Sequence, residues 1–173
     1  MSDAVANEEV VAVLFGEKLV SSAAFKSLFR EGMTLVEETA AYLDGPGRVD
    51  SKELVRSGAL AYATESMRLT TRLMQLASWL LLQRAVNEGE MTPEQARQEK
   101  NKVKLGSSAP EPDERTFELL PERLCQLIRQ SLRLQERIRY LDEAVAQRAQ
   151  IPDAGNAVGR QLDRLRQAFG TGS

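Results

Sequence analysis

Histidine is absent from the 173-residue chain, and cysteine occurs once, at Cys125. These two absences exclude a zinc site built from histidine and cysteine, a Ser-His-Asp or Cys-His nucleophile, a histidine acid–base catalyst and an intrachain disulfide. A thiol without a partner also fits a reducing cytosol better than a secreted compartment. Carboxylates, lysines, tyrosines and the thiol remain available for chemistry, but the composition favours a protein that is not an enzyme and uses no metal or cofactor.

A strong charge of one sign and a long apolar run are also missing. The formal net charge is −2, with 28% charged and 42% hydrophobic residues, so the chain as a whole does not attract nucleic acid. The most apolar stretch, 73–86, is shorter than the ~20 apolar residues that cross a bilayer, and it contains Gln75, Gln83 and Arg84. No basic segment precedes the apolar run 10–15, unlike in a signal peptide. We therefore expect no nucleic-acid partner, no membrane insertion and a cytoplasmic location.

Proline is rare, and its positions define where long helices can form. All six prolines lie outside the stretches 48–92 and 122–151, and a proline inside a helix costs about 3 kcal/mol. No segment shows the apolar–polar alternation of a half-buried strand. The sequence therefore predicts an all-α fold, an antiparallel three-helix bundle with a long central helix.

Caps and turn residues give the predicted boundaries. The segment 44–47 (DGPG) ends the first helix, Asp50 is suited to cap the second, and Thr92, Pro93 and Gln95 begin a short polar helix. Within a bundle spanning 22–150, we predict helices over 22–43, 51–88 and 121–150, a short polar helix over 93–104 and a loop over 105–120. Residues 1–21 are expected to form a partly ordered N-terminal segment, and residues 151–173 a flexible tail.

The predicted central helix carries two apolar stripes. One follows a heptad seam: Leu60, Ala63, Met67, Thr70, Met74, Ala77 and Leu81. The other lies beside it: Leu69, Leu73, Leu76 and Leu80. Together they are wider than one neighbouring helix can cover, so a surface for a second copy is expected. The predicted homodimer interface is Leu73, Leu76, Trp79 and Leu80, although Trp79 fits a core position equally well.

Polar residues suggest where protein partners bind. Tyr62, Glu65, Arg68 and Arg72 share one side of the central helix, either as an internal ion-pair network or as a contact surface. The cations of the short helix form either a solvated helix end or a surface for an acidic protein: Arg97, Lys100 and Lys102. The tail carries an amphipathic patch that offers a further contact: Leu162, Leu165 and Phe169.

Three long stretches resemble one known family. They are residues 28–33 (LFREGM), 35–48 (LVEETAAYLDGPGR) and 59–91 (ALAYATESMRLTTRLMQLASWLLLQRAVNEGEM), and they resemble the regulator of CtrA degradation, a ClpXP adaptor family of alphaproteobacteria. The resemblance implies a dimeric three-helix bundle that joins ClpXP already primed by a response regulator. It further implies that the protein presents cell-cycle regulators such as CtrA, or a co-adaptor that binds cyclic di-GMP, that it concentrates at a cell pole, and that the tail assists.

Two other classes of function stay open. A helical scaffold or polar-organising protein would self-associate and localise without any direct role in substrate delivery. A carboxylate-based enzyme would need a cluster of acidic residues around a pocket. The adaptor hypothesis is favoured because an adaptor acts by raising the effective concentration of a substrate at its protease, and needs no catalytic group.

Overall fold

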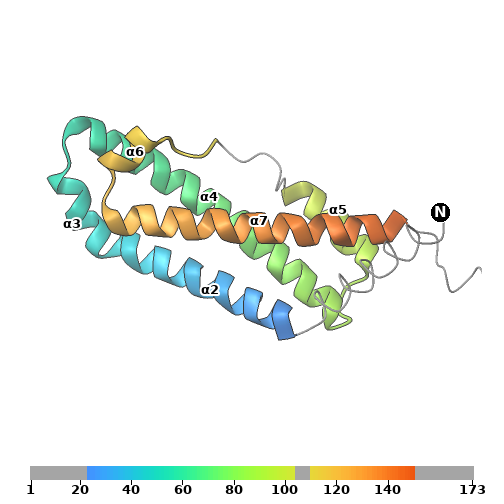
Figure 1. The fold of residues 1–173 in the computed structure, drawn as a ribbon. Helices are drawn as coiled ribbons and strands as arrows, with labels where there is room; N and C mark the ends of the chain where they lie inside the picture. Colours follow the sequence, from blue (N-terminus) through green and yellow to red (C-terminus); the bar gives the residue numbers. More distant parts are fainter. Residues whose placement is uncertain (1–22, 104–109, 151–173) are drawn as a thin grey trace, which may run out of the picture.

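The computed structural model describes residues 23–103 and 110–150, and every regular element within these ranges is an α-helix (Figure 1). The helices are α2 (Ala23–Asp44), α3 (Pro46–Glu53), α4 (Arg56–Asn87), α5 (Pro93–Val103), α6 (Glu114–Leu119) and α7 (Glu122–Gln150). The predicted all-α fold is confirmed. The predicted N-terminal segment and tail lie outside the described residues.

Three long helices, α2, α4 and α7, pack against one another as a bundle, with α3 and α6 at one end and α5 toward the other (Figure 1). α2 is antiparallel to α7, because ion pairs join Glu31 to Arg137 and Glu38 to Arg123. α2 is also antiparallel to α4, as the short connection between them predicts.

α4 and α7, in contrast, run in the same direction. Arg72 of α4 donates a hydrogen bond to Ser131, and Trp79, further along α4, donates one to Asp142, further along α7. The antiparallel three-helix bundle predicted from the sequence sets each long helix antiparallel to the next one along the chain, and that prediction is wrong for this pair. Its cause is the connection over 88–121, which is long enough to return along the roughly 48 Å of α4 before α7 begins.

The first connection also differs from the prediction. The sequence predicts one continuous helix over 51–88, but α3 and α4 are separated at Leu54 and Val55, whose ψ angles of 145° and 160° are extended. Pro46 stands in the first turn of α3. Proline is favoured there because the first amides of a helix have no intrahelical partner. Residues that resemble a simple turn thus begin an additional short helix.

α3 is held against the end of α2 by a close backbone approach. The carboxylate of Asp50, which lies inside α3 and not at a helix start, accepts a 2.8 Å hydrogen bond from the Tyr42 hydroxyl. A Cβ on Gly47 would lie 2.5 Å from the Tyr62 hydroxyl oxygen and 2.8 Å from the Tyr42 carbonyl oxygen. Only glycine permits this approach, and it fixes the direction in which the chain enters α4.

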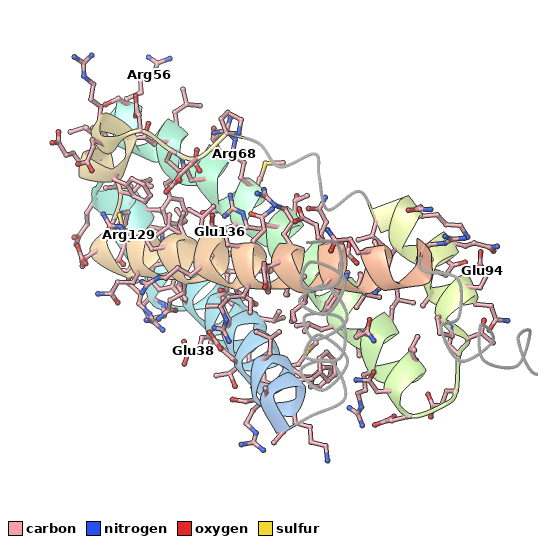
Figure 2. The ribbon with its side chains drawn as sticks, turned by 45° about the vertical axis from the view of Figure 1, so that its right-hand side comes forward. Glu38, Arg56, Arg68, Glu94, Arg129 and Glu136 are labelled. Atoms are coloured by element: carbon pink, nitrogen blue, oxygen red, sulfur yellow. The ribbon has the colours of Figure 1, made fainter. Side chains whose placement is uncertain are left out.

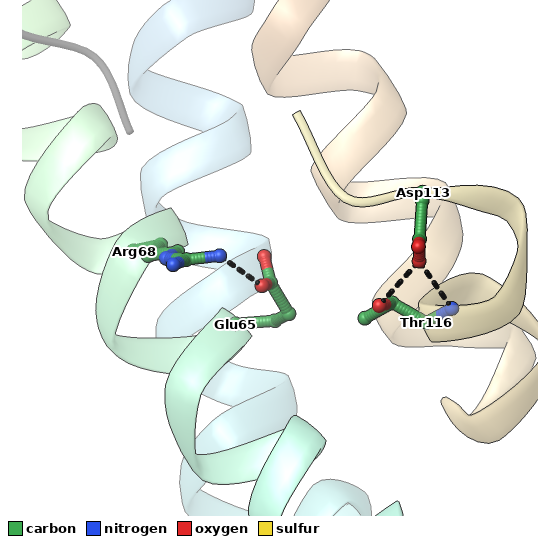
Figure 3. Close-up of polar contacts among 4 residues, drawn as sticks. All are labelled: Glu65, Arg68, Asp113 and Thr116. Carbon is green, nitrogen blue, oxygen red and sulfur yellow. Dashed lines mark hydrogen bonds and ion pairs between the residues drawn. The ribbon is translucent and has the colours of Figure 1, made fainter. Parts of the chain in front are cut away.

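The two short helices between α4 and α7 are both capped by side chains. At α5, Thr92 Oγ1 accepts from the Gln95 amide and Gln95 Oε1 accepts from the Thr92 amide, which confirms the predicted capping box. α6 lies inside the predicted loop over 105–120, and the sequence analysis missed it. Its cap is Asp113, which accepts from the Thr116 amide at 2.9 Å and hydroxyl at 2.7 Å (Figure 3).

The core lies between the three long helices. α4 contributes its second stripe, and α7 contributes one face along most of its length. The buried apolar residues of these two helices are Leu69, Leu73, Leu76, Trp79, Leu80, Leu124, Cys125, Leu127, Ile128, Leu134, Ile138 and Leu141. α4 is therefore the central helix, as predicted, but only one of its two stripes faces the core.

Candidate protein-binding surface

The polar line predicted on the central helix is largely internal. Glu65 is 3% exposed and pairs with Arg68 at 2.7 Å, while the Arg68 side chain remains 38% exposed (Figure 3). Arg72 is 5% exposed, and Tyr62 is half-buried. The line is thus a network inside the bundle, and Arg68 is its one member at the surface (Figure 2). The contact surface predicted from all four residues is wrong for Glu65 and Arg72.

Arg72 connects the two parallel helices. Its guanidinium donates a 2.9 Å hydrogen bond to Ser131 Oγ, and Ser131 in turn donates to the carbonyl oxygen of Ile128 at 2.7 Å. Burial lowers the pKa of the Arg72 guanidinium, and the carboxylates of Glu65 and Glu111 oppose this shift. A positive charge held between apolar stripes fixes the register of α4 against α7, because sliding either helix would leave it without acceptors.

Lys100, predicted as a surface cation, is the anchor of α5. Its side chain is 10% exposed, and its ammonium lies 4.5 Å from the centre of the Trp79 ring. It donates to Gln83 Oε1 at 2.8 Å and lies 3.6 Å from a carboxylate oxygen of Asp142, which also accepts from the indole of Trp79 at 2.6 Å. Burial lowers the pKa of Lys100, and Asp142 opposes that shift. The Lys100 side chain is therefore not available to a partner protein.

The remaining predicted cations of α5 do lie at the surface. Arg97 and Lys102 are exposed, and each pairs within the helix, with Glu94 and Glu99 respectively. Figure 2 shows charged side chains along the described helices, from Arg56 at one end of the bundle to Glu94 at the other. The predicted contacts Leu162, Leu165 and Phe169 lie outside the described residues.

The four residues predicted as a dimer interface belong to the core of the single chain. Trp79 and Leu80 are 0% exposed, Leu76 is 1% and Leu73 is 4%. That prediction is therefore wrong, because side chains enclosed by α2 and α7 cannot contact a second copy. The sequence analysis identified both stripes of the central helix but placed the dimer interface on the one that faces the core. We call that one the inner stripe; it consists of Leu69, Leu73, Leu76 and Leu80.

The outer stripe of α4 is an apolar surface. Leu60, Met67, Met74 and Leu81 stand seven residues apart and are 71%, 72%, 67% and 52% exposed. We call these four residues the outer stripe. Small side chains separate them, namely Ala63, Thr70 and Ala77. The spacing places all seven on one side of the helix, away from the core.

This side of α4 also carries little charge. Between residues 57 and 83 the charged residues are Glu65, Arg68 and Arg72, and two of these three are buried. The Thr70 hydroxyl donates to the carbonyl oxygen of Ser66, and the Ser78 hydroxyl donates to that of Met74, both at 2.8 Å. Because these hydroxyls are bonded to their own helix, the face around the outer stripe is less polar than its composition indicates.

The lone thiol lies in the interior, and the acidic residues of the described part of the chain do not gather as metal ligands. Cys125 is buried, donates to the carbonyl oxygen of Phe117 at 3.4 Å, and has its pKa raised by burial. Residues 23–103 and 110–150 bring together no group of three metal-ligating side chains. None of the described helices is both long and apolar enough to cross a membrane.

Comparisons with known proteins agree with this fold. A family model described as "Protein of unknown function (DUF1465)" matches residues 16–169. Among solved structures, the chain is similar to RcdA from Caulobacter crescentus CB15, with 56% sequence identity, a TM-score of 0.59, and coverage of 72% of this chain and 92% of that chain. No curated protein matches the chain. A family model that covers most of the chain, together with this identity to RcdA, shows that the chain belongs to the RcdA-like DUF1465 family.

Proposed function

We propose that the protein is a non-enzymatic adaptor for regulated proteolysis. The observation that carries this proposal is the outer stripe of α4, an exposed and nearly uncharged apolar surface on a rigid helix, in a chain 56% identical to RcdA. Exposed apolar surface of this extent marks protein interaction sites more often than it marks ordinary solvated surface. Two polar clusters, around Arg72 and around Lys100, are engaged in contacts within the bundle.

The proposed partners follow from the resemblance to the regulator of CtrA degradation. They are ClpXP, a response-regulator-type priming factor, a co-adaptor that binds cyclic di-GMP, and substrates such as CtrA. In this proposal the protein acts as a homodimer in the cytoplasm and concentrates at a cell pole. No catalytic residue is assigned, because an adaptor accelerates degradation by holding a substrate near the unfoldase and so raising its effective concentration.

The bundle is suited to holding two bound partners at a fixed distance. α4 extends about 48 Å, and its register against α7 is fixed by the Arg72–Ser131 and Trp79–Asp142 hydrogen bonds. A rigid spacer keeps two bound partners at a defined separation, which preserves the entropic advantage of tethering. We place the contact for an acidic partner on the outside of α5, at Arg97 and Lys102.

The direct test is degradation of a purified CtrA-type substrate by reconstituted ClpXP and its priming factor. We expect the protein to raise the initial rate of substrate loss and to change nothing when ClpXP is left out. An unchanged rate with all these components present would reject the adaptor function. If the protein nevertheless self-associates and localises in cells, that result would favour the alternative of a polar-organising scaffold.

A pair of variants tests the α5 contact. Arg97→Glu with Lys102→Glu, and Glu94→Lys with Glu99→Lys, break the same two ion pairs, and exposed pairs of this kind each contribute only about 0.2–0.5 kcal/mol. Only the first variant removes positive charge from the surface. We expect slower delivery with the first variant and wild-type delivery with the second. Equal effects of both would mean that α5 does not bind an acidic partner.

A further inference from the structure

We infer that an open groove between the start of α2 and the end of α7 is the docking site of residues 10–15 of the same chain. The groove has a volume of about 580 Å³. Its apolar lining comes from Phe25 and Leu28 of α2 and from Leu141 of α7, and its rim includes Tyr140, which is 70% exposed. The inference concerns a contact within one chain and does not depend on the adaptor function.

The groove lies where α7 extends beyond the start of α2. The ion pair between Glu31 and Arg137 sets these two residues at the same level of the antiparallel helices. Ala24 stands seven residues before Glu31 and is therefore level with about residue 144 of α7, since both helices rise by about 1.5 Å per residue. Because α7 continues to Gln150, its last turns have no α2 residue beside them. The part of the chain that precedes α2 is therefore well placed to cover the groove.

Residues 10–15 have the composition that such a groove requires. They read VVAVLF and include no polar side chain. Contact of all these side chains with water is unfavourable, so the run gains free energy from any apolar surface that it can reach. Residues 16–22 connect the run to α2, and even when fully extended this connection spans only about 26 Å. The run therefore stays close to the groove.

The outer stripe of α4 is a less suitable surface for this run. It faces away from the core, and hence away from both α2 and α7. To cover it, the segment that precedes α2 would have to pass around α4. The groove, in contrast, begins at Ala24, in the first turn of α2.

The tail is the second segment of the chain that could enter the groove, and it fits less well. α7 carries the chain about 10 Å past Glu143 before it ends at Gln150, so the tail would have to reverse its direction to return. The tail segment 160–169 (RQLDRLRQAF) contains four charged residues, whereas residues 10–15 contain none. Because an unpaired charge in an apolar groove is costly, the groove favours residues 10–15.

The charges at the rim match those that flank the run. The rim carries both signs, with Glu136, Arg137, Arg139 and Glu143. The run is preceded by two acidic residues and followed by one acidic and one basic residue, namely Glu8, Glu9, Glu17 and Lys18. Arg137 already pairs with Glu31, so we assign Arg139 to the acidic residues before the run. A charged rim around an apolar centre is the usual arrangement of a protein contact.

Disulfide cross-linking in the full chain tests where the run lies. The test pair is Ala12→Cys with Glu143→Cys, which joins the middle of the run to the rim of the groove. The control pair is Ala12→Cys with Arg30→Cys, because Arg30 is exposed on the side of α2 opposite its groove residues. The native thiol, Cys125, is buried. We expect the test pair to form its disulfide at least tenfold faster than the control pair and within a single chain. Equal rates would overturn the inference.

Two other results of the same experiment would identify a different occupant. Faster cross-linking of Gln167→Cys with Glu143→Cys than of the test pair would assign the groove to the tail. Disulfides formed between differently tagged chains, and not within one chain, would assign it to the run of a second copy. Either result would overturn the inference.

Hydrogen exchange tests the same contact without a new thiol. Val11→Glu with Leu14→Glu places two charges inside the run, and the matched control, Ala4→Glu with Ala6→Glu, adds the same charge before it. We expect the first variant to lose at least tenfold in amide protection over residues 27–32 of α2 and 138–145 of α7, and the control to keep the wild-type protection. Wild-type protection in both variants, or equal losses in both, would overturn the inference. Neither measurement involves ClpXP, so its outcome is independent of the adaptor function.

Discussion

Replacement of Lys100 by alanine should release α5 from the bundle while leaving the three long helices folded. α5 has 11 residues, and helices of this length are marginal in water without tertiary contacts. Its one buried apolar side chain is Ala96. The contacts of the Lys100 ammonium with Trp79, Gln83 and Asp142 therefore supply most of the attachment.

The size of the effect can be worked out from these contacts. A largely desolvated cation–π contact is worth about 2 kcal/mol, and a hydrogen bond from a charged donor about 1.5–3 kcal/mol. Desolvation of the ammonium, which lowers the pKa of Lys100, offsets part of this gain. We therefore expect the local opening free energy of α5 to fall by about 2–3 kcal/mol, so amide protection should fall by roughly 30- to 150-fold.

Hydrogen exchange measured by mass spectrometry resolves this change by segment. Peptides covering 93–103 should lose protection in Lys100→Ala, whereas peptides from α7 should not. Trp79 is the only tryptophan in the sequence, so its fluorescence provides a second signal of altered packing. Lys102→Ala is the control, because Lys102 is 71% exposed and pairs only with its helix neighbour Glu99. Equal protection of α5 in the two variants would refute the anchoring role of Lys100.

Three further predictions concern stability. Arg72→Ala should lower the free energy of unfolding in urea by about 3 kcal/mol and Arg72→Met by about 1 kcal/mol, since methionine fills the space without a buried charge; equal losses would contradict this. Gly47→Ala should lower the melting temperature, and the free energy of unfolding by about 1–3 kcal/mol, because the new methyl group would clash with a backbone oxygen. An unchanged melting temperature would show that α3 can shift to accommodate the methyl group. Burial raises the pKa of both Tyr42 and Tyr62, and the hydrogen bond to Asp50 raises that of Tyr42 further. These tyrosines therefore lose their protons at lower pH in the unfolded chain than in the folded one. The free energy of unfolding should accordingly fall as the pH rises above about 10. Phenolate absorbance should accordingly show late-ionising tyrosines, and simultaneous ionisation of all three at the unfolded value would contradict the packing.

The sequence was sufficient to predict the long helices but not their directions. Proline positions and caps located α2, the main part of α4, α5 and α7 within a few residues, because these signals act locally. The break at Leu54 and Val55 has no proline or glycine to mark it. It follows from the docking of α3, through its Gly47, against Tyr42 of α2, which is a tertiary contact. The parallel orientation of α7 likewise depends on the path of a long connection, which composition does not determine.

The candidate site shows the same division between local and tertiary information. An amphipathic pattern reports which residues share a face, but on α4 two adjacent apolar faces compete for one core, and only packing decides which is enclosed. One wrong prediction, that Lys100 lies at the surface, could have been corrected from the local sequence. Ala96 and Lys100 are four residues apart and so share a face of α5, and a small apolar residue on a mostly polar helix indicates the docked side.

The two stripes of α4 separate folding from association. The inner stripe is enclosed by α2 and α7, so Leu76→Ala should cost about 2–5 kcal/mol of stability by leaving a cavity in the core. Met67 on the outer stripe is 72% exposed, so its replacement by alanine removes little buried contact from the single chain. The folded chain does not require an apolar residue at that position, whereas a docking surface does. Loss of self-association in Met67→Ala with an unchanged free energy of unfolding, measured at a concentration where the chain is monomeric, would therefore assign the outer stripe to a partner and the inner stripe to the fold.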